Sequence, residues 1–281
     1  MSRIARNIVI TGGTSGIGRA CFELFTKKGD NVIILARNNP ENLPNFYKCD
    51  VSNKEEVKSV FNSIGAKYSG IDVLVNNAGF GVSGAIELVS DDDIKNLFNV
   101  NFFGVINCYK AALPYMNKNS SIINISSACA LFPLPFRGLY CASKSAVNMI
   151  TFSMKMECNP FNVKVSSVCP GDVKTNFTKN RVKIFETNDR YGDRIANATN
   201  KVDSRENKRM KPEKVAKVVY KVSRKINPKP FVIVGFKYKL LYFAMRFLPL
   251  SWLLHFTSKF FGGFNKQKDK TLNNTEGETN G

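Results

Sequence analysis

The chain has 281 residues, of which 43% are apolar; this excludes a disordered protein and suits one α/β domain with a full core or two very small domains. Seven scattered cysteines without a CxxC pair argue against a disulfide framework and fit a reducing compartment. The formal net charge of +19 favours polyanionic partners such as nucleic acid, anionic lipid or phosphorylated ligands, with a generic solubility charge as an equal alternative.

Apolar strands alternate with amphipathic helices along most of the chain. The patterns predict strands at residues 7–11, 31–37, 45–50, 71–79, 120–127, 162–171 and 231–235, and helices at 16–28, 54–68, 91–116 and 138–157. This alternation predicts an α/β fold, a single Rossmann-type doubly wound parallel sheet of about seven strands with helices on both faces, plus C-terminal apolar helices. Ligands of such sheets bind at the carboxyl ends of the strands.

We expect one domain over residues 1–264. Within it, residues 172–211 are polar and lack periodicity, which is typical of a substrate lid or a disordered insertion. Residues 237–262 are rich in leucine and aromatic residues and are predicted to form amphipathic helices, whereas the polar, glycine-containing residues 265–281 are predicted to be a disordered tail. The start, MSRIARNIVITGG, lacks the apolar core of a secretory signal, which predicts a cytoplasmic protein.

The stretch TGGTSGIG joins the first predicted strand to the first predicted helix. Glycines at 12, 16 and 18 allow a tight turn and a close backbone approach, and the following helix presents free N–H groups to a phosphate. The pattern predicts a dinucleotide-binding turn, with a ligand-free glycine turn as the alternative. The residues expected to contact the cofactor here are Gly12, Thr14, Ser15, Gly16, Ile17 and Gly18.

Arg37 stands at the end of the second strand, where NAD-binding proteins usually carry an acidic residue. A planar guanidinium suits the 2′-phosphate of NADP, and the next carboxylate along the chain is Glu41. We therefore predict NADP(H) rather than NAD(H), with an exposed surface arginine as the alternative.

The motifs TGGTSGIG, NNAG (76–79), YCASK (140–144) and PG (170–171) occur in this order. Together they make the sequence resemble the short-chain dehydrogenase/reductase family, in its compact single-domain branch, over about residues 8–175. The resemblance implies an oxidoreductase that acts on CH–OH groups with a nicotinamide dinucleotide. A glycine frequent in the family shortly after the catalytic serine is replaced here by Ala130.

The resemblance also implies roles for four side chains. Tyr140 would donate a proton to the substrate carbonyl, and Lys144 would lower the pKa of that phenol and hold the nicotinamide ribose. Residues i and i+4 share a helix face, and a neighbouring cation lowers a phenol's pKa from its usual value of about 10. Ser127 would hydrogen-bond the substrate oxygen, and the interval 140 − 127 = 13 favours it over Ser126. Asn101 would hold a water in a proton relay to Lys144.

The same resemblance implies cofactor contacts for Tyr140 and Lys144 and for further residues. Near the adenine and along the fourth strand they are Asp50, Val51, Asn77, Ala78 and Gly79, and around the nicotinamide they are Pro170, Gly171, Val173 and Thr175. No metal site is expected.

Two apolar regions bear on the substrate. Phe132, Pro133, Leu134 and Phe136 lie between Ser127 and Tyr140 and are expected to form either a hydrophobic pocket wall or ordinary packing. Lys237, Lys239 and Arg246 interrupt the first half of the apolar run over residues 237–262, and Pro249 sits in its middle, so a membrane-spanning helix is not expected. This region could instead be a surface anchor on anionic lipid, a cap over the pocket or a subunit interface.

These observations predict an NADP(H)-dependent enzyme that reversibly reduces a ketone or aldehyde carbonyl to an alcohol, on a lipid-like or steroid-like substrate. The alternative is a catalytically silent dinucleotide-binding sensor or scaffold. We expect a homodimer or homotetramer, peripheral contact with a membrane as one option, and no specific nucleic acid, because no matching motif is present. The single histidine, His255, excludes a Ser-His-Asp hydrolase within one subunit.

Overall fold

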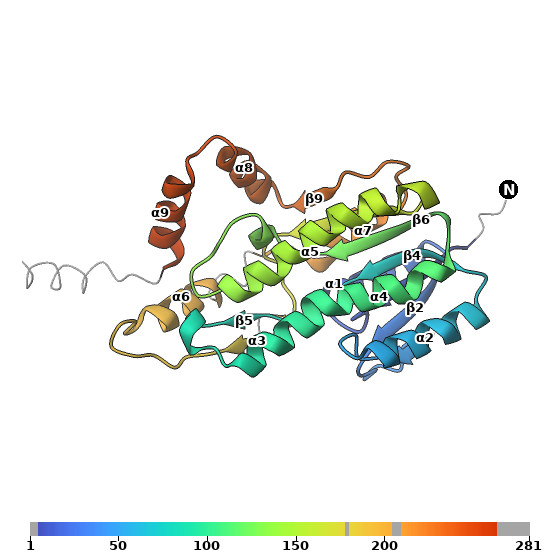
Figure 1. The fold of residues 1–281 in the computed structure, drawn as a ribbon, viewed down its shortest axis with the longest axis horizontal. Coiled ribbons are helices and arrows are strands. Elements are labelled where there is room, and N and C mark those ends of the chain that lie inside the picture. Colours follow the sequence, from blue (N-terminus) through green and yellow to red (C-terminus); the bar gives the residue numbers. More distant parts are fainter. Residues whose placement is uncertain (1–4, 178–179, 204–208, 263–281) are drawn as a thin grey trace, which may run out of the picture.

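Seven parallel strands form the central sheet of the computed structural model, which describes residues 5–177, 180–203 and 209–262. Their order across the sheet is β3-β2-β1-β4-β6-β7-β9 (Figure 1). The strands are β1 (Asn7–Thr11), β2 (Asn31–Ala36), β3 (Phe46–Lys48), β4 (Ile71–Asn76), β6 (Met116–Ile125), β7 (Lys164–Pro170) and β9 (Phe231–Val234). The order reverses direction between β1 and β4, which places the ligand crevice at their carboxyl ends. The predicted doubly wound sheet is confirmed.

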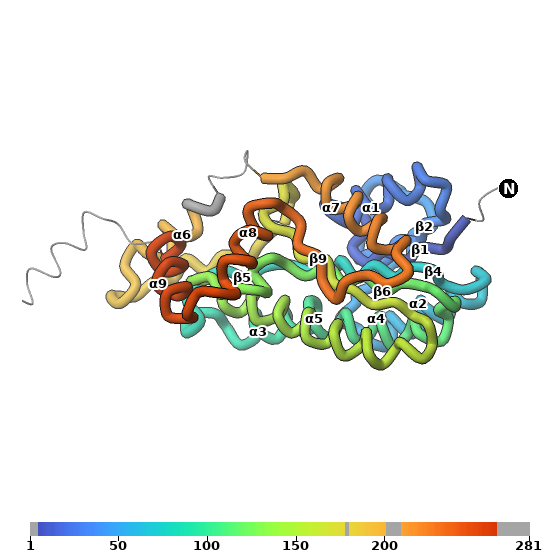
Figure 2. Tube along the Cα trace, turned by 90° about the horizontal axis from the view of Figure 1, so that it is seen from above, coloured from blue at the N-terminus to red at the C-terminus, as the bar shows by residue number. Residues whose placement is uncertain are grey.

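Helices cover both faces of this sheet (Figure 2). One face carries α1 (Gly16–Lys27) and α7 (Pro212–Val222), and the other carries α2 (Lys54–Lys67), α4 (Gly104–Ala112) and α5 (Gly138–Glu157). Successive side chains of a strand point to opposite faces. In β1, Ile8 and Ile10 accordingly belong to the α1–α7 core, whereas Val9 belongs to the other core. Burial on both faces explains why the strand is apolar throughout.

The predicted helix over residues 91–116 is not continuous. It consists of α3 (Asp91–Phe98), a π-helical turn at Asn99–Phe103, α4 and a 3₁₀ turn at Leu113–Tyr115, and strand β6 begins at Met116. Pro114 stands in the 3₁₀ turn, where it cannot supply the N–H that a longer α-helix needs. The π-helical turn carries Asn101, and such turns are frequent at functional sites.

The described part of residues 172–211 contains two elements that the lack of periodicity did not predict. Strand β8 (Val182–Lys183) pairs in parallel with β5 (Val82–Ser83), apart from the main sheet. Helix α6 (Arg194–Asp203) follows β8, and Val173 bridges to Met210 at the far end of the segment. The segment therefore begins and returns at the carboxyl end of β7.

The apolar C-terminal region forms α8 (Phe236–Met245) and α9 (Leu250–Phe261), with Pro249 as the N-cap residue of α9. Leu253 of α9 packs with Ala128 and Phe132, which follow β6, and residues of α8 complete this cluster. None of the described helices is both long enough and apolar enough to cross a membrane. The predicted disordered tail, residues 265–281, lies outside the described residues.

Candidate functional site

The glycine turn between β1 and α1 lies at the carboxyl edge of the sheet. Gly12 and Gly16 have φ angles of +64° and +54°, which favour glycine. A Cβ atom on Gly18 would clash with the carbonyl oxygen of Gly12. Ser15, the exposed N-cap residue of α1, makes no capping hydrogen bond with its side chain. The Ser15 side chain therefore does not occupy the first main-chain N–H groups of α1, which can donate to a phosphate. A dinucleotide requires such donors for its pyrophosphate.

Asn77 and Ala78 hold this turn against β4. Their main-chain N–H groups donate to Thr11 Oγ1 at 2.9 and 3.0 Å. The Asn77 side chain donates to the carbonyl oxygens of Thr11 and Gly12 at 3.0 and 3.1 Å. The side chain of Asn77 thus supports the glycine turn rather than facing the crevice.

A cavity of about 440 Å³ lies where the adenosine half of a dinucleotide is expected. Arg37 and Asp50, which the sequence predicts as cofactor contacts, both line it, as do Asn38, Lys48 and Glu56. Asp50 is held by Ser52, whose N–H and hydroxyl donate to its Oδ1 at 2.9 and 2.7 Å. Val51, the next predicted contact, directly follows Asp50 and is buried.

Lys48 is a candidate cofactor contact that the sequence analysis missed. Strands β2 and β3 pair in parallel, with Ala36 opposite Lys48, so that Lys48 lies beside the end of the strand that carries Arg37. Both side chains are exposed and line the same cavity. The signal that could have found it is the register of β3 against β2, which no single sequence displays.

Tyr140 and Lys144 lie one turn apart on α5, and Lys144 is buried, with 4% of its surface exposed. The Lys144 ammonium donates to the Ile125 carbonyl oxygen at 3.0 Å. Burial lowers the pKa of Lys144 to about 8, and the nearby thiols of Cys129 and Cys169 oppose this shift.

The Tyr140 ring packs against Phe177, with 5.6 Å between the ring centroids. Burial raises the pKa of the Tyr140 phenol above its usual value, whereas hydrogen bonding with Ser127 and the charge of Arg181 act the other way. The structure thus differs from the expectation that Lys144 brings this pKa down. The cost of removing the phenolate from water outweighs the hydrogen bond with Ser127 and the charge of Arg181.

The two adjacent serines differ in accessibility. Ser126 is buried and its hydroxyl donates to the main-chain oxygen of Lys144 at 3.0 Å. Ser127 is half-buried, and its Oγ accepts from the Cys129 N–H and thiol at 3.3 and 3.1 Å. Ser127 therefore stands beside Tyr140 with a partly accessible hydroxyl, whereas Ser126 is part of the packing of α5 on the sheet.

Asn101 is fully buried and is held by protein groups. Its Nδ2 donates to the Phe80 carbonyl oxygen at 3.0 Å and to Ser143 Oγ at 3.1 Å, and its Oδ1 accepts from the Phe80 N–H at 3.0 Å. A Cβ on Gly79 would lie 2.8 Å from Asn101 Oδ1 and 3.3 Å from Lys144 Nζ. Asn101 thus positions the chain after β4 beside Lys144, and its role in holding a water stays a prediction.

The residues predicted to border the nicotinamide follow β7. A Cβ on Gly16 would lie 3.2 Å from Thr175 Cγ2, so Thr175 faces the glycine turn. A Cβ on Gly171 would clash with the ring of Tyr238, whose hydroxyl donates to Asp172 Oδ2 at 2.8 Å. Helix α8 therefore rests on the end of β7, next to Pro170 and Val173.

The four apolar residues between Ser127 and Tyr140 have different surroundings. Phe132 is buried in a cluster with Leu253 of α9, which agrees with ordinary packing rather than with a pocket wall. Leu134 and Phe136 line a small cavity beside α6, and Pro133 is exposed. Among the described residues, no cluster of three or more His, Cys, Asp or Glu side chains is arranged to hold a metal ion.

The pKa of Lys144 gives an expected pH dependence. Because the ammonium loses its proton as the pH rises through about 8, whereas the Tyr140 pKa is raised, kcat/KM for NADPH is expected to fall above about pH 8. Initial rates at saturating ketone between pH 6 and 10 measure this. Lys144→Arg, which keeps its charge, should move the decline to higher pH. A wild-type profile that stays flat to pH 10 would contradict the assignment.

Comparisons with known proteins point to one family. A family model described as "short chain dehydrogenase" matches residues 6–184. A 3-ketodihydrosphingosine reductase of Bacteroides thetaiotaomicron is 36% identical over 230 residues, which cover 80% of this chain and 85% of the relative. A solved short-chain dehydrogenase from Streptomyces avermitilis has 26% identity and a TM-score of 0.76, covering 88% of this chain and 93% of the other. The solved structure of ElxO with NADP bound has 26% identity and a TM-score of 0.67, covering 84% and 100%.

Proposed function

The chain belongs to the short-chain dehydrogenase/reductase family of oxidoreductases, and from this premise we propose that it is an NADP(H)-dependent carbonyl reductase. It would reduce a ketone or aldehyde to an alcohol, reversibly, on a hydrophobic substrate. The observation that carries the proposal is the meeting of Ser127, Tyr140 and Lys144 at the sheet edge that also carries the glycine turn.

The reaction assigns a task to each of these side chains. When bound, the dinucleotide supplies the hydride. Tyr140 holds the proton for the carbonyl oxygen, and its raised pKa keeps the phenol protonated at neutral pH. The Ser127 hydroxyl would hydrogen-bond the same oxygen and orient it towards the phenol. Lys144, fixed by the Ile125 carbonyl oxygen, would supply positive charge beside the reacting groups and a donor for the ribose.

The preference for NADP(H) is supported by the cavity that Arg37 lines. Lys48 adds a second cation there, so two positive side chains could hold a 2′-phosphate. The two carboxylates of this cavity already have partners: Asp50 accepts from Ser52, and Glu56 Oε2 accepts from the Asp50 N–H at 2.7 Å. The similar protein ElxO has NADP bound.

A hydrophobic substrate is supported by the apolar side chains near Ser127 and Tyr140. We call this part of the site the reaction end. Leu253 and Met245 pack with apolar residues of the loop after Ser127, so apolar side chains gather next to the proposed site. The name of the Bacteroides thetaiotaomicron relative, 3-ketodihydrosphingosine reductase, also describes a reductase of a ketone. A lipid-like ketone is therefore the substrate class that we propose.

The function is tested by following NADPH and NADH oxidation with a panel of ketones of increasing chain length. We expect oxidation of NADPH in preference to NADH, and higher kcat/KM for long-chain than for short-chain ketones. Tight NADPH binding without turnover of any ketone would instead favour the silent sensor or scaffold.

We also propose that the outer face of α8 and α9 rests on an anionic lipid surface. Phe247, between the two helices, and Trp252 of α9 expose 73% and 59% of their surfaces, and other aromatic side chains of both helices are exposed as well. Lys237, Lys239 and Arg246 lie on or beside the same helices and would attract acidic headgroups. The opposite side of these helices packs on the loop after Ser127, so a membrane at the outer face would lie close to the proposed site.

The double substitution Phe247→Ser and Trp252→Ser is expected to reduce co-sedimentation with phosphatidylserine-containing vesicles at least tenfold, since burying one such side chain contributes about 1.5–3 kcal/mol. The matched control is Phe161→Ser with Ile226→Ser, two residues that are 59% and 87% exposed elsewhere. Equal binding of both variants and wild type would contradict the proposal. A change in subunit number without a change in vesicle binding would identify the face as a subunit interface.

A homodimer or homotetramer remains part of the proposal. Phe103 and Met149 are exposed apolar residues, the first just before α4 and the second on α5. If α4 and α5 pair with the same helices of a second subunit, Phe103 and Met149 would become buried. Light scattering of the purified protein gives the subunit number.

A further inference from the structure

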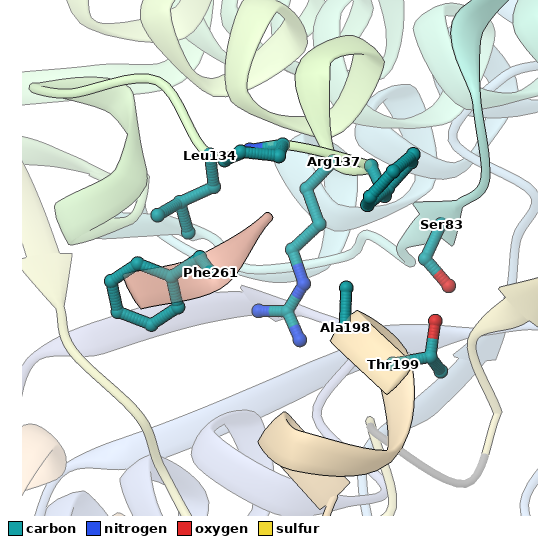
Figure 3. A pocket seen from close by; sticks show the side chains of 8 residues that line it. Ser83, Leu134, Arg137, Ala198, Thr199 and Phe261 are labelled. Carbon is teal, nitrogen blue, oxygen red and sulfur yellow. The ribbon is translucent and has the colours of Figure 1, made fainter. Parts of the chain in front are cut away.

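A small cavity lies beside the reaction end and is not part of the cofactor crevice (Figure 3). Its volume is about 10 Å³, enough for roughly one water-sized group. It is enclosed by the loop before α5, by β5, by α6 and by the last turn of α9. Its lining includes Ser83, Leu134, Arg137, Ala198, Thr199 and Phe261.

Two buried polar groups of this cavity have no partner among the described residues. They are Nη2 of Arg137 and the hydroxyl of Ser83, a residue that is only 4% exposed. Figure 3 shows the Arg137 guanidinium between Phe261 and Ala198, and the Ser83 and Thr199 oxygens facing each other beyond Ala198. A buried donor without a partner destabilises the fold, and more so when it is charged. The arrangement therefore calls for a ligand that accepts hydrogen bonds.

The backbone around Arg137 is held in an unusual conformation. Phe136 has a φ angle of +58°, which a bulky residue seldom adopts, and its carbonyl oxygen accepts from the Gly84 N–H at 3.0 Å. Its ring packs against Tyr191, and the Arg194 guanidinium lies 5.8 Å from the ring centre. Strained residues of this kind cluster at sites that hold ligands. Here the strain fixes the direction of the next side chain, Arg137.

Arg137 is also close to the reacting groups. It is the N-cap residue of α5, three residues before Tyr140, and its carbonyl oxygen accepts from the Cys141 N–H at 2.9 Å. Its charge acts on the thiol of Cys129, which donates to Ser127 Oγ at 3.1 Å. The Arg137 charge thus acts on a side chain that directly contacts Ser127.

We propose that Arg137, assisted by the Ser83 hydroxyl, binds the carboxylate of a hydrophobic oxo-acid substrate. This inference rests on the proposed reductase function and names the class of its substrate. A guanidinium matches the two oxygens of a carboxylate, and the apolar residues around it strengthen the charge-assisted hydrogen bonds. A substrate with an ammonium group at this place would be repelled. Because the cavity holds only one water-sized group, one carboxylate oxygen would occupy it and the rest of the substrate would lie outside it.

The test measures binding of dodecanoate and dodecanol by titration calorimetry, with NADP⁺ at saturation. Wild-type protein is expected to bind dodecanoate at least tenfold more tightly than dodecanol. Arg137→Gln should lower the dodecanoate affinity at least tenfold and leave the dodecanol affinity within twofold. Ser83→Ala should lower the dodecanoate affinity severalfold. The matched control is Arg224→Gln, which removes an equal charge from an exposed arginine away from the cavity and should keep the preference for dodecanoate.

Several outcomes overturn the inference: no preference for dodecanoate in wild type, no binding of either compound, or a preference that survives in Arg137→Gln. Should Arg137→Gln fail to fold, the Ser83→Ala and Arg137→Lys variants test the inference instead. The lysine keeps the positive charge, so Arg137→Lys should retain part of the preference for dodecanoate over dodecanol. If no ketone is reduced, yet dodecanoate binding still depends on Arg137, the reductase assignment fails and the carboxylate site stands.

Discussion

Replacing Tyr140 by phenylalanine is expected to lower NADPH-dependent ketone reduction at least 100-fold, because a positioned general acid contributes about 10²–10⁴ in rate. The ring would remain packed against Phe177, so the substitution removes the proton donor and little else. NADPH affinity should stay within about twofold. Steady-state rates and titration of NADPH fluorescence measure the two quantities.

Tyr242→Phe is the matched control for this experiment. Tyr242 lies on α8 and packs edge-to-face on Phe231, so the same hydroxyl is removed outside the proposed site. It should keep nearly the wild-type rate. A Tyr140→Phe enzyme that keeps more than a tenth of the rate would show that another group donates the proton. A loss of NADPH binding along with activity would show that the phenol acts in cofactor binding instead.

Replacing Arg37 by aspartate is expected to change the ratio of kcat/KM for NADPH to that for NADH by about 100-fold or more. A charge-assisted hydrogen bond contributes about 1.5–3 kcal/mol, and the new carboxylate would also repel a 2′-phosphate while accepting from a ribose hydroxyl. Arg224→Asp makes the same change of charge at an exposed site and should leave the ratio unaltered. Parallel rate measurements with both cofactors give the ratio.

Lys48→Ala separates the two cations of the adenosine cavity. Lysine is a compact point charge without the fork geometry of arginine, so we expect a smaller loss with NADPH, about tenfold. The loss should shrink as the salt concentration rises, because both side chains are exposed. If neither substitution alters the ratio, the 2′-phosphate is not held in this cavity and the preference for NADP(H) is wrong.

The sequence predicts the sheet well because the strand signal is local. Buried parallel strands are apolar on both faces, as β1 is with Ile8, Val9 and Ile10, and glycine and proline mark their ends. The site residues follow these ends, so their gathering at one edge of the sheet could be expected before the structure was known. Their chemical roles stay predictions, to be tested by the substitutions above.

What the sequence did not predict depends on contacts between distant segments. The break at Asn99–Phe103 lets Asn101 bind the main chain at Phe80, a partner that helical periodicity cannot reveal. Strand β8 is too short to show the alternation of apolar and polar residues that predicts a strand. The raised pKa of Tyr140 reflects burial by the whole fold, whereas the sequence shows only the neighbouring Lys144.

The packing of α7 against α1 has a consequence for how the protein reaches its native state. Val215 and Val219 cover the same core as Cys21 and Phe25, and Arg6 donates to Ser223 Oγ at 3.3 Å across a separation of 217 residues. Nascent chains that end before α7 leave this apolar surface in water, and closing so long a loop is slow. We therefore expect the N-terminal half to complete its core only after α7 has left the ribosome, and a fragment that lacks α7 not to fold as an autonomous nucleotide-binding unit.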